Sequence, residues 1–454
     1  MIETGTFARL RAYRIGFLVM VLGILVTVSL AGLADAKTFT VNSTQDFSDV
    51  YPGDGVCDTI DVQLLNPCTL RGAIQEANSL AGMDVIYFDI PGGGVRIIAP
   101  NSQLPVVTQQ VTIDGYTQPG ATKNTLVRGN NAVLRIELDG SSAPGVLLPD
   151  GLLVGASDSV VRGLVINHFS GEGVQLSGSN NRLEGNFIGT NASGLGTNVG
   201  PDDPGNHLSG VIIAQGTSGN VIGGDTPEKR NIISANSGAG VRISASSSNK
   251  VQGNSIGRTR DGSLLGNGRS GVEISGADDN LVGGTVSGVS NDITGNGGGL
   301  SGGSGVTVSG AGSTSNRILR NSIADNEDLG VDLGSAEFGD GITLNDPQDA
   351  DTGANNLQNF PVLTAVAHSR GKTTIKGKLN SRPDRTFTIQ FFSNPSGDEG
   401  KKFVGQKSVT TNAIGNVSFE FRPAQAVPTG QTVTATATNS GGNTSEFSAP
   451  RTAA

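Results

Sequence analysis

Two adjacent pairs of carboxylates are the first residues of this sequence whose spacing could support chemistry. Asp202 and Asp203 lie in a Pro/Gly-rich loop with His207 close by, and Asp278 and Asp279 stand in a tight turn. Glycoside hydrolysis uses two acids that flank the scissile bond. These five residues are therefore the catalytic candidates for a polysaccharide-cleaving enzyme, whereas Asp-rich turns are usually only solvated turns.

The groups that would have to complete such a site are missing near both pairs. A pectate-lyase-like reaction needs clustered carboxylates for Ca²⁺ and a basic residue that abstracts a proton. Neither pair is accompanied by a Gly-His-Gly or Arg-Ile-Lys segment, and the three histidines are scattered along the chain. Arg258 and Arg260 fit sugar or carboxylate contacts, and they fit turn cations too. The sequence thus favours a non-catalytic protein, with a polysaccharide lyase or glycoside hydrolase as the alternative.

A third group of carboxylates predicts a metal site. The stretch LNDPQDADTGANN places Asp346, Asp349 and Asp351 within six residues, followed by Gly353. Ca²⁺ binds six to eight oxygens, which carboxylates and backbone carbonyls of a tight loop can supply together. The spacing differs from an EF-hand and has no Glu at the twelfth position. Ca²⁺ is the one cofactor that we predict, and a solvated acidic linker is the alternative.

Cys57 and Cys68 are the only cysteines of the chain. In an exported protein we expect them to form a disulfide, which the loop-entropy model values at about 3 kcal/mol. A metal pair is the alternative, but no His or further Cys ligand lies nearby in the sequence.

The N-terminal segment predicts export. Three arginines precede the apolar run 15–30, and Ala34-Asp35-Ala36 is a small-x-small cleavage site, so residues 1–36 form a predicted signal peptide. An uncleaved membrane anchor is the alternative. Removing this segment leaves 28 basic and 38 acidic residues of the 31 and 40 in the whole chain. Nucleic acid and anionic membranes are poor partners for that charge. We expect a secreted or cell-surface protein with no membrane span after cleavage.

Repeats of short strands then indicate the architecture. Glycine-led strands begin 25 to 37 residues apart at Gly173, Gly210, Gly240, Gly271, Gly305 and Gly330, and asparagine-led strands fall between them. Repeats of this length, with period-2 strands and polar turns, indicate a solenoid. We predict an all-β protein built on a right-handed parallel β-helix. A β-propeller is the alternative, but its blades need longer strands.

The stretch NKVQGNSIG shows how one coil is built. Val251 and Ile256 are expected to point inward from two successive strands, and the pair Gly253-Asn254 bends the chain between them. When the coils stack, residues of the same type lie above one another in successive coils. Buried asparagines then form hydrogen-bonded ladders, and Ile and Val fill a dry interior.

The ends of a solenoid must be covered. In the predicted N-terminal cap, residues 37–88, PCTLRGAIQEANSLAG indicates a short helix with Thr69 as its N-cap. The β-helix is expected over 89–345 and an Asp/Asn-rich linker over 346–360. Residues 361–454 contain about seven alternating segments, which indicate an immunoglobulin-like β-sandwich.

The box DGVCDTIDVQLLNPCTLRGAIQEAN resembles the Cys-Ser-Leu-Arg-Glu-Ala-Ile box of the CSLREA-domain proteins, which are exported bacterial right-handed β-helix proteins. The resemblance continues through VTIDGYTQPGA, EGNFIGTN, RNIISAN and NNLQNFPVLT. It implies architecture and export, and it carries no activity. The family has Ser and Glu where this chain has Thr69 and Gly72, so the reciprocal capping bond is lost. We therefore expect an exported protein with a structural, adhesive or polysaccharide-binding role, whose partners are extracellular polysaccharide or cell-surface components.

Overall fold

The computed structural model describes residues 36–59, 67–142, 149–196, 205–299, 302–334 and 341–454. All of them belong to one compact unit, Ala36–Ala454. Nearly all of the predicted signal peptide lies outside the described residues. Within the described part of the chain, no helix is both long and apolar enough to cross a membrane.

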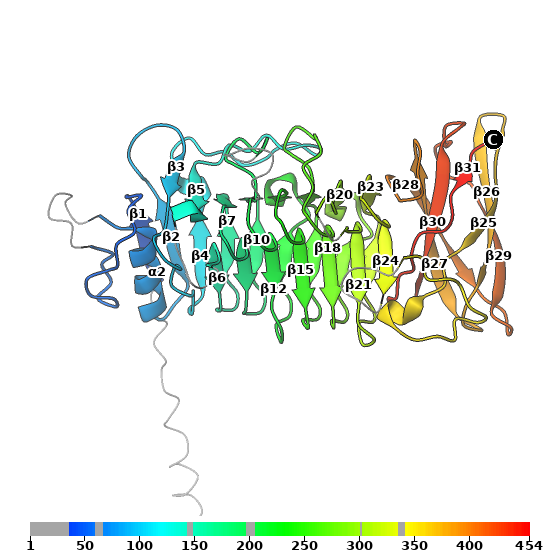
Figure 1. Ribbon diagram of the computed structural model, residues 1–454, viewed down its shortest axis with the longest axis horizontal. Coiled ribbons are helices and arrows are strands. Elements are labelled where there is room, and N and C mark those ends of the chain that lie inside the picture. The colour runs from blue at the N-terminus through cyan, green and yellow to red at the C-terminus, as the bar shows by residue number, and fades with distance from the viewer. Residues whose placement is uncertain (1–35, 60–66, 143–148, 197–204, 300–301, 335–340) are drawn as a thin grey trace, which may run out of the picture. The chain divides into compact units, whose positions relative to one another are not determined.

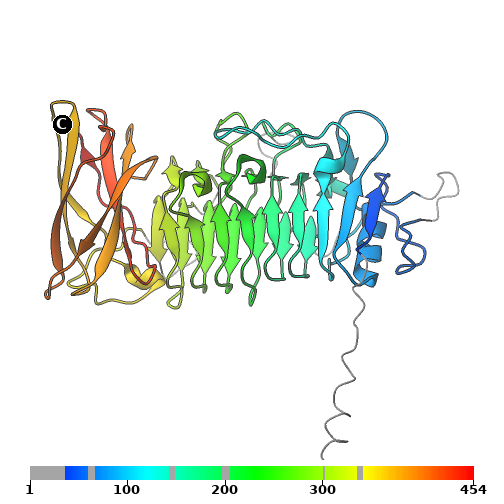
Figure 2. The same cartoon turned by 180° about the vertical axis from the view of Figure 1, so that it is seen from behind.

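Three parallel sheets form the body of the protein (Figures 1 and 2). Sheet A contains β1 (Thr38–Val41), β2 (Asp84–Phe88), β4 (Val111–Asp114), β7 (Val160–Arg162), β10 (Arg182–Glu184), β13 (Val221–Gly223), β16 (Lys250–Gln252), β19 (Leu281–Gly283) and β22 (Arg317–Leu319). Sheet B contains β3 (Arg96–Ile98), β5 (Ile136–Asp139), β8 (Leu164–Asn167), β11 (Phe187–Ile188), β14 (Ile232–Ile233), β17 (Ser255–Ile256), β20 (Asp292–Thr294) and β23 (Ser322–Ala324). Sheet C contains β6 (Leu152–Val154), β9 (Val174–Leu176), β12 (Val211–Ile213), β15 (Val241–Ser244), β18 (Val272–Ser275), β21 (Val306–Ser309) and β24 (Val331–Gly334). From β10 onward, the chain supplies one strand to sheet A, then to B, then to C in each coil. This confirms the predicted right-handed parallel β-helix.

The interior of the solenoid is a stack of aliphatic side chains in register. Val251 pairs with Ile222 in the preceding coil and with Val282 in the next. Ile256 pairs in the same way with residues of β14 and β20. Both side chains are fully buried, whereas Lys250 is exposed. The predicted inward orientation of Val251 and Ile256 is therefore confirmed.

A glycine makes the bend between these two strands. Gly253 has φ +69°, in the left-handed region that L residues with a side chain rarely adopt. A Cβ at this position would also collide with the carbonyl oxygen of Gly224 in the preceding coil. The predicted Gly253-Asn254 corner is thus present.

Asparagines line all three corners of the described solenoid, and all of those in the ladders are buried except Asn326, which is half-buried. Along each corner, the side chain or backbone amide of one asparagine donates to the side-chain oxygen of the next, over 2.8–3.2 Å. The three ladders are Asn181, Asn220, Asn249, Asn280, Asn316 and Asn355; Asn186, Asn231, Asn254, Asn291 and Asn321; and Asn206, Asn236, Asn267, Asn296 and Asn326. Because a buried amide without partners is costly, each ladder specifies the register of the coils.

The N-terminal end is covered by the helix α2 (Leu70–Ser79). Its buried face includes Leu70, Ala73 and Ile74, and the hydroxyl oxygen of Thr69 accepts a hydrogen bond from the Gly72 amide over 3.0 Å. Cys57 is disulfide-bonded to Cys68, as expected. β1 and β2, which lie in the segment expected as a cap, are already paired in parallel within sheet A, so the solenoid begins before residue 89.

Residues from 362 onward form two antiparallel sheets with their own apolar core. One sheet contains β25 (Val362–Ser369), β26 (Lys372–Asn380) and β29 (Asn416–Phe421), and the other contains β28 (Lys402–Thr410), β27 (Thr386–Asn394), β30 (Thr432–Asn439) and β31 (Arg451–Thr452). We call residues 361–454, which contain these seven strands, the sandwich. Short 3₁₀ turns complete the described elements: η1 (Gly115–Thr117), η2 (Gly140–Ser142), η3 (Pro227–Lys229), η4 (Ser287–Val289) and η5 (Ala354–Leu357).

The sandwich covers the C-terminal edge of all three solenoid sheets. In sheet A, the Ile318 amide donates to the Thr444 hydroxyl over 3.1 Å. In sheet B, Ile323 forms an antiparallel bridge with Gly400. In sheet C, the Leu333 amide donates to the carboxylate of Glu446. An unpaired strand edge exposes backbone donors and acceptors, so these bonds make the sandwich the cap of the solenoid.

Candidate functional site

Among the described candidates, the structure does not bring Asp278 and Asp279 together with His207. Asp202 and Asp203 lie outside the described residues, and His207 is exposed at the corner that follows sheet B. Asp278 and Asp279 lie at the corner between sheets C and A, where Asp278 Oδ1 accepts hydrogen bonds from the amide and hydroxyl of Thr314. Asp278 therefore stabilises a turn, and no contact joins it to His207.

The other two histidines are engaged in structural contacts. His168 Nδ1 lies 3.1 Å from Asp139 Oδ1, with both side chains largely buried. Burial would raise the pKa of Asp139, but hydrogen bonds from His168 and Ser141 hold it below its usual value. His368 contacts the carbonyl oxygen of Val427 and the hydroxyl of Thr373.

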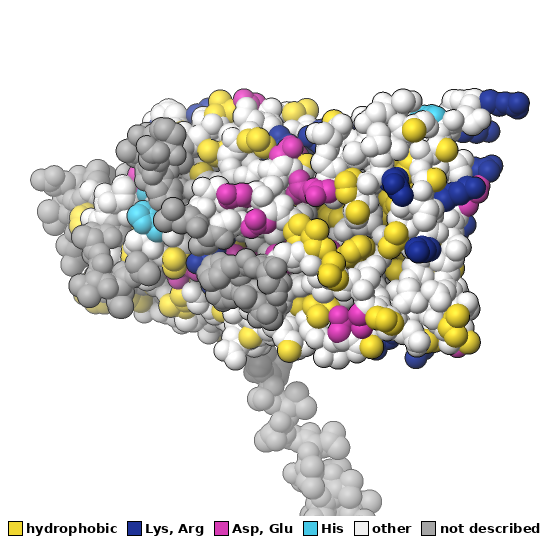
Figure 3. Space-filling view, turned by 45° about the vertical axis from the view of Figure 1, so that its right-hand side comes forward, with side chains coloured by type: hydrophobic (Ala, Val, Ile, Leu, Met, Phe, Trp, Pro, Cys, Tyr) yellow, Lys and Arg dark blue, Asp and Glu magenta, His cyan; other side chains and the backbone are white. Residues whose placement is uncertain are grey.

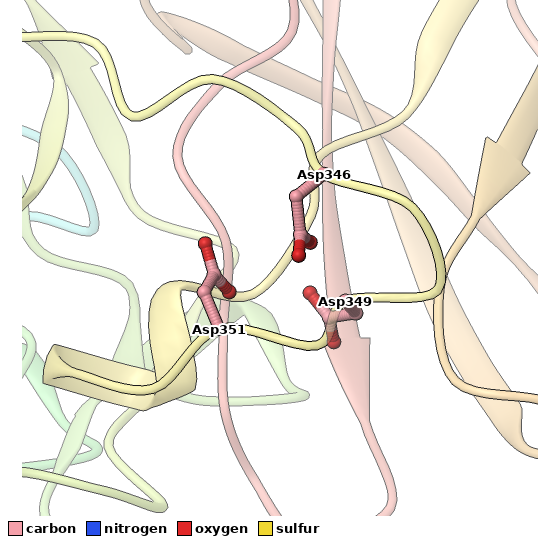
Figure 4. Close-up of side chains that lie close together, drawn as sticks. All are labelled: Asp346, Asp349 and Asp351. Carbon is pink, nitrogen blue, oxygen red and sulfur yellow. The ribbon is translucent and has the colours of Figure 1, made fainter.

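The three aspartates of the predicted metal site do lie together (Figure 4). One carboxylate oxygen from each of Asp346, Asp349 and Asp351 lies within 4.8 Å of the others. Asp349 is buried, and its two oxygens accept hydrogen bonds from the Asn359 amide at 2.7 Å and the Ser381 hydroxyl at 2.9 Å. Its pKa is raised, chiefly by burial.

The three carboxylates of this cluster provide the kind of ligand that a hard cation binds, but not the full number. Asp351 Oδ1 is buried and makes no hydrogen bond, and its pKa is raised by burial and by the neighbouring charge of Asp346. Three carboxylates supply oxygens of the kind that Ca²⁺ binds, but fewer than its six to eight ligands unless carbonyls or waters join them. The clustering is a property of the fold, and the metal itself stays a prediction.

A small polar pocket opens on sheet A, where β4, β7 and β10 lie side by side (Figure 1). Its volume of about 30 Å³ is room for about two waters. The pocket can therefore take one polar group of a larger molecule. We call it the Tyr116 pocket. It is lined by Tyr116, Lys123, Arg162, Glu184, Glu228 and Lys229.

Two glycines allow Tyr116 to lie across successive coils. A Cβ at Gly163 would stand 2.7 Å from Tyr116 Cδ2, and one at Gly185 would collide with the phenol oxygen. Both glycines have positive φ. The hydroxyl of Tyr116 donates to the Gly185 carbonyl over 2.7 Å.

The charged side chains of the Tyr116 pocket are paired. Arg162 Nη2 lies 2.7 Å from Asp114 Oδ2, and this bond raises the pKa of the arginine further. Glu184 accepts from Arg182 over 2.7 Å, Lys229 pairs with an aspartate, and Lys123 lies 3.9 Å from Glu228. Burial raises the pKa of Tyr116 far above its usual value.

One acid outside this pocket has a pKa close to neutral pH. Glu172, just before β9, is buried, and burial together with the nearby Asp150 raises its pKa to about 7. Asp150 Oδ1 accepts a hydrogen bond from the Glu172 amide over 2.7 Å, and burial also raises the pKa of Asp150.

Sequence reasoning missed both Tyr116 and Glu172. The only local signals are the pairs Arg162-Gly163 and Glu184-Gly185, in which a charged residue precedes a glycine at the end of a strand. The contacts that make these residues a site come from coils whose spacing the sequence does not reveal.

Comparison with known proteins yields similar folds only. No family model and no curated protein matches the chain. Similar solved structures include the A-modules of the Azotobacter vinelandii mannuronan C-5 epimerases AlgE6 (14% identity, 68% of this chain and 84% of that one, TM-score 0.31) and AlgE4 (17%, 57% and 75%, 0.28). Tailspike protein 2 of the Escherichia coli O157:H7 bacteriophage CAB120 is also similar (9%, 81% and 62%, 0.24). At these identities and TM-scores, no activity is carried over to this chain.

Proposed function

We propose that this protein is an exported, non-catalytic β-helix protein that binds extracellular polysaccharide at the cell surface or after secretion. The observation that carries the proposal is the Tyr116 pocket. It presents hydrogen-bond donors and acceptors on a rigid solenoid, and its size suits one hydroxyl or carboxylate of a longer chain.

The chemistry of the pocket favours binding over catalysis. A general base works best when its pKa lies near the operating pH. Tyr116 stays protonated because its pKa is raised, and its hydroxyl is already donated to Gly185. Glu184 is held by Arg182. Because Tyr116 and Glu184 are already engaged in these contacts, the pocket is better suited to holding a polar group.

Export and family membership belong to the same proposal. The helix α2, which covers the N-terminal end of the solenoid, and the disulfide between Cys57 and Cys68 support the resemblance to CSLREA-domain proteins. A disulfide is stable in an oxidising compartment outside the cytosol. Secretion and cleavage of residues 1–36 are tested by N-terminal sequencing of the protein recovered from outside the cell.

Glu172 supports a second candidate function, a polysaccharide-active enzyme. A buried carboxylic acid with a pKa of about 7 can donate or accept a proton at neutral pH. Its neighbour Asp150 would be the second carboxylate. Glu172 lies at the start of a strand of sheet C, whereas the Tyr116 pocket lies on sheet A, so the two candidates are separable by mutation.

A binding and product assay tests both functions. The full chain is incubated with a panel of neutral and acidic polysaccharides, with and without Ca²⁺. We expect retardation of the protein by at least one polysaccharide and no new reducing ends or unsaturated products. Lys123→Ala combined with Glu228→Gln should weaken binding, and Lys250→Ala, an exposed lysine elsewhere on sheet A, is the matched control. Products that disappear in Glu172→Gln would establish the enzyme instead.

A further inference from the structure

Charge is divided unevenly between the two parts of the chain. Residues 361–454 hold 11 Lys and Arg against 5 Asp and Glu, whereas residues 37–360 hold 17 against 33. In Figure 3, dark-blue Lys and Arg side chains gather toward the right-hand edge, while magenta Asp and Glu lie nearer the middle. The sandwich is therefore the basic part of an acidic protein.

Part of the negative charge of the sandwich is withdrawn from its surface. Of the five acids in the sandwich, Glu399 accepts a hydrogen bond from Asn326, and Glu446 accepts hydrogen bonds from the amides of Leu333 and Thr343. These two carboxylates accept hydrogen bonds at the junction of the sandwich with the solenoid, so they contribute little to its exposed surface. Only three acids remain exposed on the sandwich: Asp384, Asp398 and Glu420.

Four cations surround or adjoin one of these exposed acids. Lys376 Nζ lies 3.7 Å and Arg422 Nη2 lies 2.7 Å from carboxylate oxygens of Glu420. Lys407, on the edge strand β28 of the other sheet, donates to the carbonyl oxygen of Glu420 over 3.0 Å. Lys378 follows Lys376 on the same face of β26. We call Lys376, Lys378, Lys407 and Arg422 the Glu420 cluster.

The strand register sets the outward direction of these side chains. Burial alternates along β26, so Lys372, Lys376 and Lys378 are exposed while Ile375 and Leu379 are in the core. Side chains two residues apart on one face of a strand are about 7 Å apart. The next strand, β29, places Glu420 opposite Lys376 and Ser418 opposite Lys378. The result is a row of charges beside small polar groups.

The ion pairs of the cluster with Glu420 contribute little to the stability of the fold. The side chains of Lys376 and Arg422 are 57% and 68% exposed, and exposed ion pairs stabilise a fold by at most about 1 kcal/mol. Four cations around one carboxylate leave an excess of positive charge, which repels itself unless an anion binds.

We propose that the Glu420 cluster binds an anionic polysaccharide, a polymer that carries a carboxylate on each sugar. A row of lysines on an extended strand matches a linear chain of regularly spaced negative charges. Asn380, Asn416 and Ser418 on the same face can hydrogen-bond to the sugar hydroxyls. This inference deepens the proposed function and rests on it.

The composition of the face argues against a protein partner. The centres of protein interfaces are depleted in Lys and Ser, and their binding energy comes from buried aromatic residues and Arg. The outward face of β26 and β29 offers Lys, Thr, Asn, Ser and Glu. A second copy of the chain, with its acidic solenoid, is nevertheless an outcome that the test must separate.

The test compares two triple variants of the full chain on two polymers. Lys376→Ala, Lys378→Ala and Arg422→Ala together remove three of the four cations of the cluster, and Arg385→Ala, Lys402→Ala and Arg451→Ala together remove three exposed cations elsewhere on the sandwich. Binding to polygalacturonate and to uncharged dextran is measured by affinity electrophoresis and calorimetry, at low and high NaCl. Unchanged thermal unfolding shows that each variant is folded. If the cluster variant does not fold, the single substitution Lys378→Glu replaces it.

We expect the cluster variant to lose about tenfold or more of its affinity for polygalacturonate, to keep any affinity for dextran, and to show less salt dependence than the control. Equal losses in the two triple variants would overturn the assignment to the cluster. A wild-type protein that binds dextran but not polygalacturonate would overturn this inference and leave the proposed function standing. Failure to bind any polysaccharide of the panel would overturn both. Self-association that only the cluster variant loses, measured by sedimentation without polymer, would assign the cluster to a second copy.

Discussion

The side-chain amide of Asn326 donates to Glu399 Oε1 over 2.8 Å. Asn326 is the last member of an asparagine ladder that begins at Asn206, and Glu399 belongs to the sandwich. Asn326 is half-buried, and its side-chain amide also donates to the Ile293 carbonyl over 3.3 Å. No further asparagine follows it in the ladder, so Glu399 takes the place of the next acceptor. The sandwich therefore ends the ladder with the carboxyl group of Glu399 and joins the two parts of the protein by this hydrogen bond.

This junction predicts a dependence of stability on pH. Burial raises the pKa of Glu399 and of Glu446 from about 4.5 to about 7. The folded protein then binds these protons more tightly than the unfolded chain does. The stabilisation is fully present below pH 4.5 and is lost as the pH rises through about 7. For Glu446, which is 2% exposed, the loss is on the order of 2–3 kcal/mol.

The measurement is the unfolding free energy between pH 4.5 and 8. We expect it to fall with rising pH in the wild type and to fall less steeply in Glu446→Gln. Glu420→Gln changes an exposed glutamate of the same sandwich and should leave the slope unaltered. An unchanged slope in Glu446→Gln would contradict the assignment.

The interior of the solenoid predicts position-specific intolerance to charge. Val251→Asp or Ile256→Asp would bury an unpaired carboxylate and should cost several kcal/mol, on the order of 3 or more. Lys250→Asp and Ser255→Asp point away from the core and should cost about 0.5 kcal/mol or less. Chemical denaturation of the four variants checks this, and equal tolerance at all four positions would refute the register.

The cap helix predicts a stabilising substitution. A Cβ added at Gly72 would lie 3.4 Å from Thr69 Oγ1 and 3.5 Å from Cys57 Sγ, which are ordinary contacts. Because glycine is about 1 kcal/mol less favourable than alanine within a helix, Gly72→Ala should raise the unfolding free energy by up to about 1 kcal/mol. Gly253→Ala, at a positive φ, is the contrasting variant and should destabilise. A loss of stability in Gly72→Ala would show that the cap has no room.

The aspartate cluster predicts a response to calcium. If Asp346, Asp349 and Asp351 bind Ca²⁺, a concentration ten times the Kd should raise the unfolding free energy by about 1.4 kcal/mol. Asp351→Asn is the cleanest variant because Asp351 Oδ1 makes no hydrogen bond, whereas Asp349 also holds Asn359 and Ser381. Asp398→Asn, an exposed aspartate of the sandwich, is the control. Calorimetric titration that gives no heat, or the same heat in Asp351→Asn, would remove the metal site.

Local sequence patterns were enough to predict the solenoid, its N-terminal cap and its core. Val251, Gly253 and Ile256 occupy the expected places because strand alternation and left-handed corners are local properties, repeated in every coil. The helix α2 follows from the same kind of local pattern, with Thr69 before an apolar face. The clustering of Asp346, Asp349 and Asp351 was also predictable, since six residues of one loop contain all three.

The contacts between side chains outside the core could not be predicted without the three-dimensional structure. Tyr116 and Lys229 line one pocket, and Lys376, Lys407 and Arg422 converge on Glu420, although each set comes from separate strands or coils. An outward side chain acquires its neighbours from adjacent strands, and the loop lengths between those strands vary. The periodicity of a strand predicts that such a side chain points toward solvent. The register of the strands and the pairing of sheet edges determine which side chains become its neighbours.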